Sequence, residues 1–241
     1  MRRKPRALIP WFPGTNCHDE TAYALRKAGA NPMIRTIEQL RQRPRSLCET
    51  DLIGLAGGFS DGDHFGSGRL PAMELCLRFR DQLLEALERK IPIIGICNGF
   101  QKLVAMGLLP GAAGLGNPTA VLDFNSSGRF EHRHSVKLVL HRSIGCVWTQ
   151  DLDGMEIEVP VGHGEGKLRV MNGEVLVTAT YGTPQGVADF PISPNGSPIA
   201  GICDPRGLIM GMMPHPERRV DVIHGNADGL LIFQSGVNAV R

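Results

Sequence analysis

The chain has 241 residues, enough for one large domain or two small ones, and its apolar content of 42% is sufficient for a buried core. The 26 Lys and Arg residues nearly balance the 24 Asp and Glu residues, which argues against a protein that binds nucleic acid or a membrane surface. We find neither the apolar core of a signal peptide nor a run of roughly 20 apolar residues, the length that spans a bilayer. We therefore expect a soluble, cytoplasmic protein.

The first half of the chain alternates between short apolar runs and helical patterns. This alternation predicts a parallel sheet covered by helices on both faces, with ligands bound at the carboxyl ends of the strands. The pattern after residue 70 indicates one long helix, whose apolar stripe consists of Met73, Cys76, Leu77, Leu84 and Leu87. The expected strands cover residues 7–12, 33–36, 51–56 and 91–96, and the expected helices cover 18–28, 71–90 and the segment from 98 to Gly107.

The second half of the chain has a different pattern. Short β-type runs over residues 136–140, 157–161 and 175–180 are separated by turn signals and indicate an antiparallel insertion on the main sheet. A last core strand is expected over residues 208–213, followed by a C-terminal amphipathic helix that contains Phe233. Two loops are expected, over residues 110–130, which are rich in Gly, Asn and Ser, and over residues 182–198, which contain four prolines.

Cys97 stands at the corner between an expected strand and an expected helix. This is the geometry of a nucleophile elbow, in which glycines such as Gly95 and Gly99 relieve crowding at the turn. The free N–H groups and positive dipole end of the new helix would point at the sulfur and favour the thiolate, which is the attacking form. Cys97 is therefore the candidate nucleophile.

The other five cysteines are interpreted as small buried side chains in a reducing compartment. No pair has Cys-x-x-Cys spacing, and no His/Cys group has the spacing of a zinc site, so no metal is expected. These five residues are Cys17, Cys48, Cys76, Cys146 and Cys203.

His215 follows the last expected core strand in the segment Met212-Met213-Pro214-His215-Pro216-Glu217-Arg218. The two prolines stiffen this turn, which suits a side chain that must be aimed. His215 could take the proton of Cys97 and return it to a leaving amine, and Glu217 could orient the imidazole as the acid of a triad does. The alternative is a surface turn without a role. Arg218 is interpreted either as a contact with a partner subunit or an anion or, more simply, as a charge solvated at the surface.

Two glycine-rich segments complete the candidate site. Gly57-Gly58 follows a strand, and a backbone N–H there could form an oxyanion hole with the N–H of Asn98; a plain turn is the alternative. Residues 162–166, Gly-His-Gly-Glu-Gly, are expected to form a loop that brings the backbone close to a ligand. This segment does not have the spacing of a nucleotide P-loop.

Together these motifs resemble the class I, triad-type glutamine amidotransferases, and among them the glutaminase subunits of phosphoribosylformylglycinamidine synthase. Gly-x-Cys-x-Gly-x-Gln at residues 95–101 marks the amidotransferase class. Its full form, Gly-Ile-Cys-Asn-Gly-Phe-Gln, together with Ser-Gly-Arg-Phe-Glu at 127–131 and His-Gly-Glu-Gly at 163–166, indicates the purine branch. Other matching stretches, among them residues 12–17, 57–63 and 213–218, extend the likeness over nearly the whole chain.

This resemblance implies an α/β fold: a flavodoxin-like three-layer sandwich with a mostly parallel central sheet and a small antiparallel insertion, in one domain over residues 1–241. It implies glutamine hydrolysis to glutamate and ammonia through a glutamyl thioester on Cys97, and purine biosynthesis as the pathway. The catalytic residues would be Cys97, His215 and Glu217, the oxyanion donors Gly58 and Asn98, and the residues that position glutamine Gln101, His163 and Gly164.

The resemblance also implies partners. Ammonia would pass to a large synthetase subunit that uses ATP and Mg²⁺ to form formylglycinamidine ribonucleotide, often with a small bridging subunit, and this chain itself would hold no cofactor. Three alternatives remain open: a class I subunit that serves another synthetase, a cysteine hydrolase of similar fold that does not use glutamine, and a catalytically silent regulatory subunit. The last would be expected to lack Cys97, His215 or Glu217.

Overall fold

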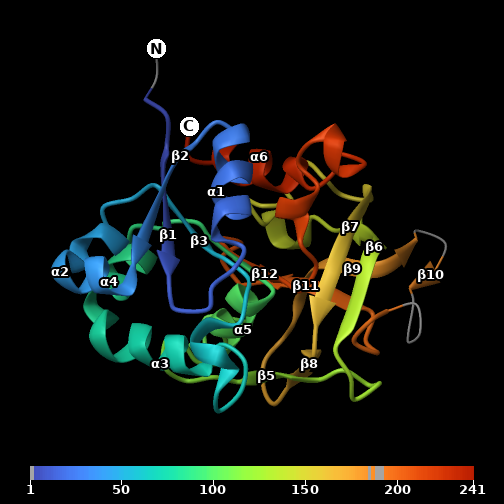
Figure 1. Cartoon of the computed structure of the whole chain (residues 1–241), viewed down its shortest axis with the longest axis horizontal. Coiled ribbons are helices and arrows are strands. Elements are labelled where there is room, and N and C mark those ends of the chain that lie inside the picture. Colours follow the sequence, from blue (N-terminus) through green and yellow to red (C-terminus); the bar gives the residue numbers. More distant parts are fainter. Residues whose placement is uncertain (1–2, 184–185, 188–192) are drawn as a thin grey trace.

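The computed structural model describes residues 3–183, 186–187 and 193–241 (Figure 1). Its backbone is built around one large mixed sheet. The strands are β1 (Arg6–Trp11), β2 (Asn31–Thr36), β3 (Leu52–Leu55), β4 (Ile93–Ile96), β5 (Ala120–Phe124), β6 (Glu131–Leu140), β7 (Glu156–His163), β8 (Glu165–Val170), β9 (Leu176–Thr183), β10 (Gly186–Val187), β11 (Ile199–Cys203) and β12 (Ile209–Met212). The α-helices are α1 (His18–Lys27), α2 (Ile37–Gln42), α3 (Arg69–Arg78), α4 (Arg80–Glu88), α5 (Asn98–Ala105) and α6 (Leu230–Asn238).

The first half of the sheet is parallel. Strands β2, β1, β3, β4 and β12 lie side by side in that order and run in the same direction. Their carboxyl ends therefore meet at one edge, where Leu55 pairs with Gly95 and Met212 pairs with Ile96. This arrangement confirms the predicted alternation of strands and helices.

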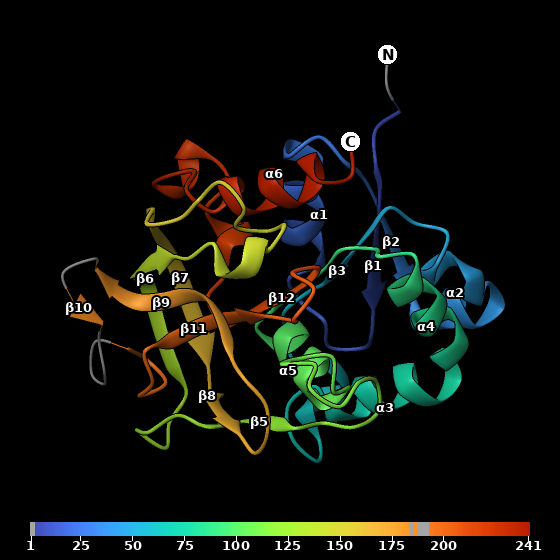
Figure 2. The ribbon, with the colours of Figure 1, turned by 180° about the vertical axis from the view of Figure 1, so that it is seen from behind.

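The second half of the sheet is antiparallel. Strands β11, β9, β6 and β7 continue the same sheet beyond β12, so the expected insertion extends the main sheet (Figure 2). Strands β5 and β8 form a separate antiparallel pair, and β10 pairs with β9. Together with the helices on both sides of the parallel half, the mixed sheet confirms the predicted α/β class.

Helices cover both faces of the parallel strands because neighbouring residues on a strand point to opposite sides. Gly54 of β3 packs on Leu25 of α1, whereas the next residue, Leu55, packs with residues of α3 and α5 on the other face. The helix α6 contacts α1 and so belongs to the first face (Figures 1 and 2). The result is a three-layer sandwich with a continuous apolar core.

The expected helix over residues 71–90 is wrong in one respect, because the structure has two helices there. Phe79 interrupts the helix with φ −122° and ψ 21°, and its side chain is buried. The change of direction turns part of the expected apolar stripe outward, so that Met73 is 55% and Leu77 is 74% exposed. Local periodicity could not reveal a break that is set by the burial of one aromatic ring.

Two of the expected loops also need correction. The segment 110–130 contains the strand β5, which pairs with β8 more than forty residues later. The loop expected over 182–198 falls partly outside the described residues, and its described parts include the end of β9 and the short strand β10. No helix in the described part of the chain is long and apolar enough to cross a membrane.

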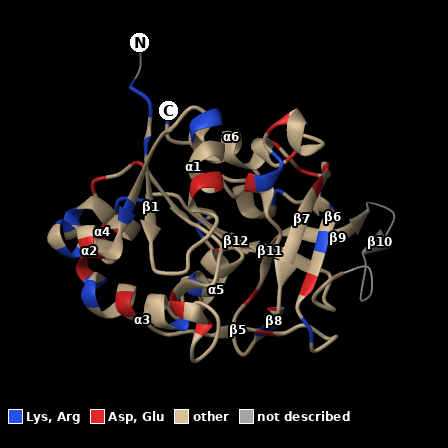
Figure 3. Cartoon of the chain, viewed as in Figure 1, with Lys and Arg blue, Asp and Glu red and all other residues tan. Residues whose placement is uncertain are grey.

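Charged side chains of both signs alternate along the outer helices α2 to α4 (Figure 3). Arg41 bonds to Glu38 and Glu74, and Arg45 bonds to Glu49 and Glu85, so these charges link consecutive segments. Exposed pairs of this kind contribute little to stability individually. The guanidinium groups of Arg41 and Arg45 are therefore paired with glutamates of the same chain.

Candidate active site

The structure places Cys97 at the sharp turn between β4 and α5. Its backbone has φ 52° and ψ −110°, a region that a side chain with a Cβ rarely occupies and that is common at functional sites. The Cys97 N–H donates to the carbonyl of Met212 at 2.8 Å, which ties the turn to the neighbouring strand β12. A Cβ on Gly99 would collide with the Leu55 carbonyl, so only glycine allows α5 to start so close to the sheet.

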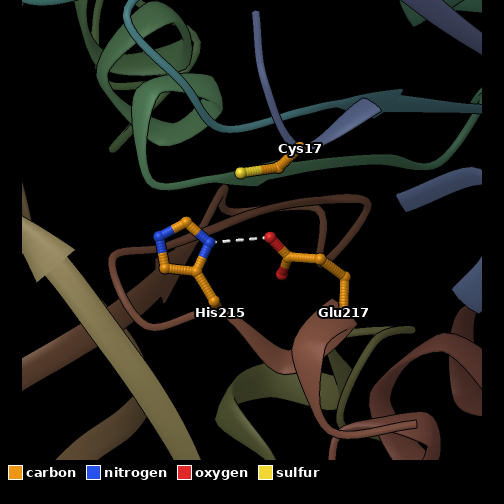
Figure 4. A group of neighbouring side chains, drawn as sticks. All are labelled: Cys17, His215 and Glu217. Atoms are coloured by element: carbon orange, nitrogen blue, oxygen red, sulfur yellow. Dashed lines mark hydrogen bonds and ion pairs between the residues drawn. The ribbon is translucent and has the colours of Figure 1, made fainter. Parts of the chain in front are cut away.

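His215 and Glu217 lie on the turn that follows β12, and both side chains are buried. His215 Nδ1 and Glu217 Oε1 are 2.7 Å apart (Figure 4). Burial lowers the pKa of His215, but the negative charges of Glu217 and Cys97 outweigh it and raise this pKa well above its usual value. The imidazole therefore holds a proton at neutral pH, with Nδ1–H donating to the carboxylate.

Gly57 is the point at which the nucleophile and the base meet. A Cβ built there would lie 3.0 Å from His215 Cε1 and 3.3 Å from Cys97 Cβ. At the next position, Gly58 has φ 139°, and a Cβ would collide with the backbone nitrogen of Asn16. The two glycines thus let the end of β3 approach the pair of side chains without steric overlap.

A cavity of about 430 Å³ opens over this turn. Six of the eight expected site residues line it: Gly58, Cys97, Gln101, His163, Gly164 and His215. The other two, Asn98 and Glu217, are buried behind it. As the first residue of α5, Asn98 has a backbone N–H without an intrahelical acceptor, and its side chain donates to Asp63 Oδ1 at 2.9 Å.

The far wall of the cavity is formed where β7 turns into β8. The segment 162–166, expected as a loop, belongs to these two strands except for Gly164, where a bend carries the chain from the main sheet into the separate pair of β5 and β8. Gln101 Nε2 donates to the carbonyl of Glu165 at 2.7 Å, and Cys97 Sγ lies 3.5 Å from the carbonyl oxygen of Gly162. These contacts hold the junction of β7 and β8 against the nucleophile.

His163 is a neutral residue of this wall. Burial, together with the nearby charges of His215 and Arg133, lowers its pKa to about 3. The amide nitrogen of Asn125 donates to the carbonyls of His163 and Arg129, so its oxygen is left to accept from His163 Nδ1 at 2.9 Å. His163 Nε2 is therefore a hydrogen-bond acceptor, and it has no partner among the described residues.

The sequence analysis missed two residues of the site, Cys17 and Arg218. Cys17 is buried as expected, but it lines the cavity, and Arg218 Nη2 donates to its sulfur at 3.1 Å. Cys17 lies at the end of the loop that follows β1 and caps α1, so its position at the carboxyl edge of the parallel strands was the available signal. The side chain of Arg218 is 40% exposed, as the interpretation as surface charge expected, but its guanidinium also contacts this buried thiol.

Cys17, His215 and Glu217 also form a group with the donor types that bind zinc. One ligand atom from each residue lies within 4.8 Å of the other two (Figure 4). In the structure, however, the glutamate engages the histidine and Arg218 engages the sulfur. Each of the three residues therefore already has a hydrogen-bond partner within the chain.

Fold and site together define a class of protein: an α/β sandwich with a cysteine at a strand–helix turn and a histidine–glutamate pair on the neighbouring strand. Residues 4–237 match the model of the CobB/CobQ-like glutamine amidotransferase domain. The chain therefore belongs to this family of glutamine amidotransferases, and within it to the phosphoribosylformylglycinamidine synthase PurQ subunits, as individual relatives show.

The relatives cover almost the whole chain. A phosphoribosylformylglycinamidine synthase subunit PurQ from Treponema denticola is 37% identical, with 98% of this chain and 99% of that protein aligned. The PurQ subunit from Thermus thermophilus is also 37% identical, with 98% and 99% aligned. A chain in the structure of PurLQS from Thermotoga maritima superposes with a TM-score of 0.81 and 33% identity, over 99% of this chain and 100% of that one. These matches favour the purine branch over other class I branches.

Proposed function

We propose that this chain hydrolyses glutamine with Cys97, His215 and Glu217 as a catalytic triad and delivers the ammonia to a synthetase subunit. The observation that carries the proposal is the meeting of three strand ends at one cavity, where the thiol, the histidine–glutamate pair and Gly58 come together. A thiolate paired with a protonated histidine, with backbone N–H donors nearby, is suited to acyl transfer.

The reaction divides into two steps. Cys97 Sγ attacks the side-chain amide carbon of glutamine, His215 gives its proton to the departing nitrogen, and ammonia leaves a glutamyl thioester. His215 then takes a proton from water, the resulting hydroxide attacks the thioester, and glutamate leaves as the thiol forms again. Glu217 keeps the imidazole oriented and stabilises its charged form in both steps.

The oxyanion of each step would be held by the N–H groups of Gly58 and Asn98. Asn98 opens α5, whose unpaired N–H groups and dipole favour negative charge there. Gln101, His163 and Gly164 line the same cavity and are proposed to position the substrate. The neutral Nε2 of His163 supports this role because it can accept a hydrogen bond from glutamine.

Similarity to a chain of PurLQS supports the proposal that this protein assembles with a large synthetase subunit and a small third subunit. We propose that the synthetase subunit uses ATP and Mg²⁺ and forms formylglycinamidine ribonucleotide. A reducing compartment keeps the Cys97 thiol free of disulfides, which supports the expectation that the protein works in the cytoplasm.

Substitution of the nucleophile tests the proposal. In the reconstituted complex, Cys97→Ala should abolish amidation with glutamine and preserve amidation with free ammonia. Cys76→Ala, which removes a partly buried thiol outside the cavity, is the matched control and should preserve both activities. An electrophilic glutamine analogue should label Cys97 alone. Loss of both activities in Cys97→Ala, or labelling of another cysteine, would contradict the proposal.

A further inference from the structure

Cys17 is a second thiol at the site for which the proposed reaction has no use. It is 2% exposed and stands between the end of β1 and the start of α1. Its backbone N–H donates to the carbonyl of Gly57 at 3.1 Å, which fixes it against the glycine where nucleophile and base meet. A Cβ built on Gly57 would lie 3.4 Å from the Cys17 sulfur, so this sulfur faces the same point as His215 and Cys97.

The sulfur of Cys17 lies between two cationic groups. On one side Arg218 Nη2 donates to it at 3.1 Å, and on the other the sulfur, a ring nitrogen of His215 and a carboxylate oxygen of Glu217 all lie within 4.8 Å of one another (Figure 4). The hydrogen bond from Arg218 holds the sulfur in place. The nearby sulfur of Cys17 is one of the groups that raise the pKa of His215, after Glu217 and Cys97.

A histidine that both takes and returns a proton must keep one ring orientation through the reaction. The contact between His215 Nδ1 and Glu217 is a single hydrogen bond, about which the ring can still tilt. Cys17 supplies a second contact from a different element, and Arg218, which belongs to the same turn as His215, closes the network. The sulfur thereby ties the turn after β12 to the start of α1.

We propose that Cys17 is a positioning residue of the glutaminase reaction: its sulfur, held by Arg218, fixes the imidazole of His215 for proton transfer at Cys97. This inference rests on the proposed function. The proposed role is not that of a nucleophile. Cys17 precedes α1, whereas the turn that presents a sulfur to the N–H groups at the start of α5 is occupied by Cys97.

The test compares Cys17→Ala and Cys17→Ser in the reconstituted complex. Cys17→Ala should lower kcat with glutamine by between about 10- and 100-fold, because a slightly displaced base loses much of its effect, while KM changes much less. The alkaline limb of the pH profile should move to lower pH, since the imidazolium loses a partner. Cys17→Ser, whose hydroxyl can still accept from Arg218 and contact the ring, should recover part of kcat. Activity with free ammonia should remain unchanged in both variants.

Several results would overturn the proposal. The first is a Cys17→Ala variant with the kcat and pH profile of the wild type. The second is an equal loss of glutamine- and ammonia-dependent activity together with a lowered melting temperature, which would mean a merely structural role. Labelling of Cys17 by the glutamine analogue, or glutamine activity retained in Cys97→Ala, would contradict the proposed function and this inference together. A wild-type kcat in Cys17→Ala beside an inactive Cys97→Ala would overturn this inference alone. If the Cys17 variants do not fold, Arg218→Gln tests the same network and should lower kcat with glutamine while KM changes much less, because the sulfur loses the donor that holds it.

Discussion

Lys102 is a buried lysine on the helix that begins at the nucleophile, and substitution by methionine should stabilise the protein. The residue is 1% exposed, and its ammonium lies 5.2 Å from the centre of the Phe12 ring. Burial lowers its pKa from 10.5 to about 8, although the charges of Asp63 and Asp61 act in the opposite direction. The folded protein therefore holds this proton less tightly than the unfolded chain does.

The magnitude follows from the two pKa values. At about 1.4 kcal/mol for each pH unit between 10.5 and about 8, charging Lys102 in the folded state costs about 3 kcal/mol. Below about pH 8 the lysine is charged in both states and the full cost is present; above about pH 10.5 it is neutral in both and the cost disappears. Between these values the unfolded chain binds more protons, so the stability of the wild-type protein gains from this group as pH rises.

The assay is urea unfolding of wild type and Lys102→Met at three pH values. The variant should be more stable by about 3 kcal/mol at pH 7, by about 2 kcal/mol at pH 9 and by less than about 1 kcal/mol at pH 10.5. Lys137→Met, at an exposed position of β6, is the control and should change the free energy of unfolding by no more than about 0.5 kcal/mol at any of them. A variant that is less stable at pH 7, or a difference that does not change with pH, would refute the reasoning.

Three further predictions concern the active site. Gly99→Ala should lose about 3 kcal/mol or more of stability in urea unfolding, because the new Cβ would collide with the Leu55 carbonyl; an unchanged unfolding midpoint would contradict the packing. Glu217→Gln removes the charge that favours the protonated imidazole, so the pKa of His215 should fall, kcat should decrease and the alkaline limb of the pH profile should move to lower pH. Nitrogen NMR should show His163 as a neutral ring protonated at Nδ1 from about pH 5 to 9, and titration near its usual pKa would exclude this assignment.

The sequence was sufficient to predict the parallel half of the fold and the place of Cys97 and His215. Apolar runs that end in glycine or in a reactive residue mark strand ends, and the carboxyl ends of parallel strands share one edge. That single geometric rule brings Cys97 of the fourth strand and His215 after the twelfth strand together, although more than a hundred residues separate them.

The features that the sequence did not reveal depend on contacts between distant segments. The break at Phe79 comes from burial of its ring, and the pairing of β5 with β8 joins segments without a local turn. The same holds for the contact between Cys17 and Arg218, which come from opposite ends of the chain. The burial of Lys102 could not be predicted either, because lysines are usually exposed and the residues that bury this one come from other parts of the chain.

The hydrogen bond from the Cys97 N–H to the Met212 carbonyl has a consequence for control of the enzyme. It makes the spacing of nucleophile and base a property of two adjacent strands in the centre of a sheet, which are among the least deformable parts of a protein. The opposite wall of the cavity ends β7, the outermost strand of the described sheet, which pairs with a strand on one side only. A partner subunit that activates the site would therefore act by moving this outer wall. The spacing of Cys97 and His215 would stay the same whether or not the site is active.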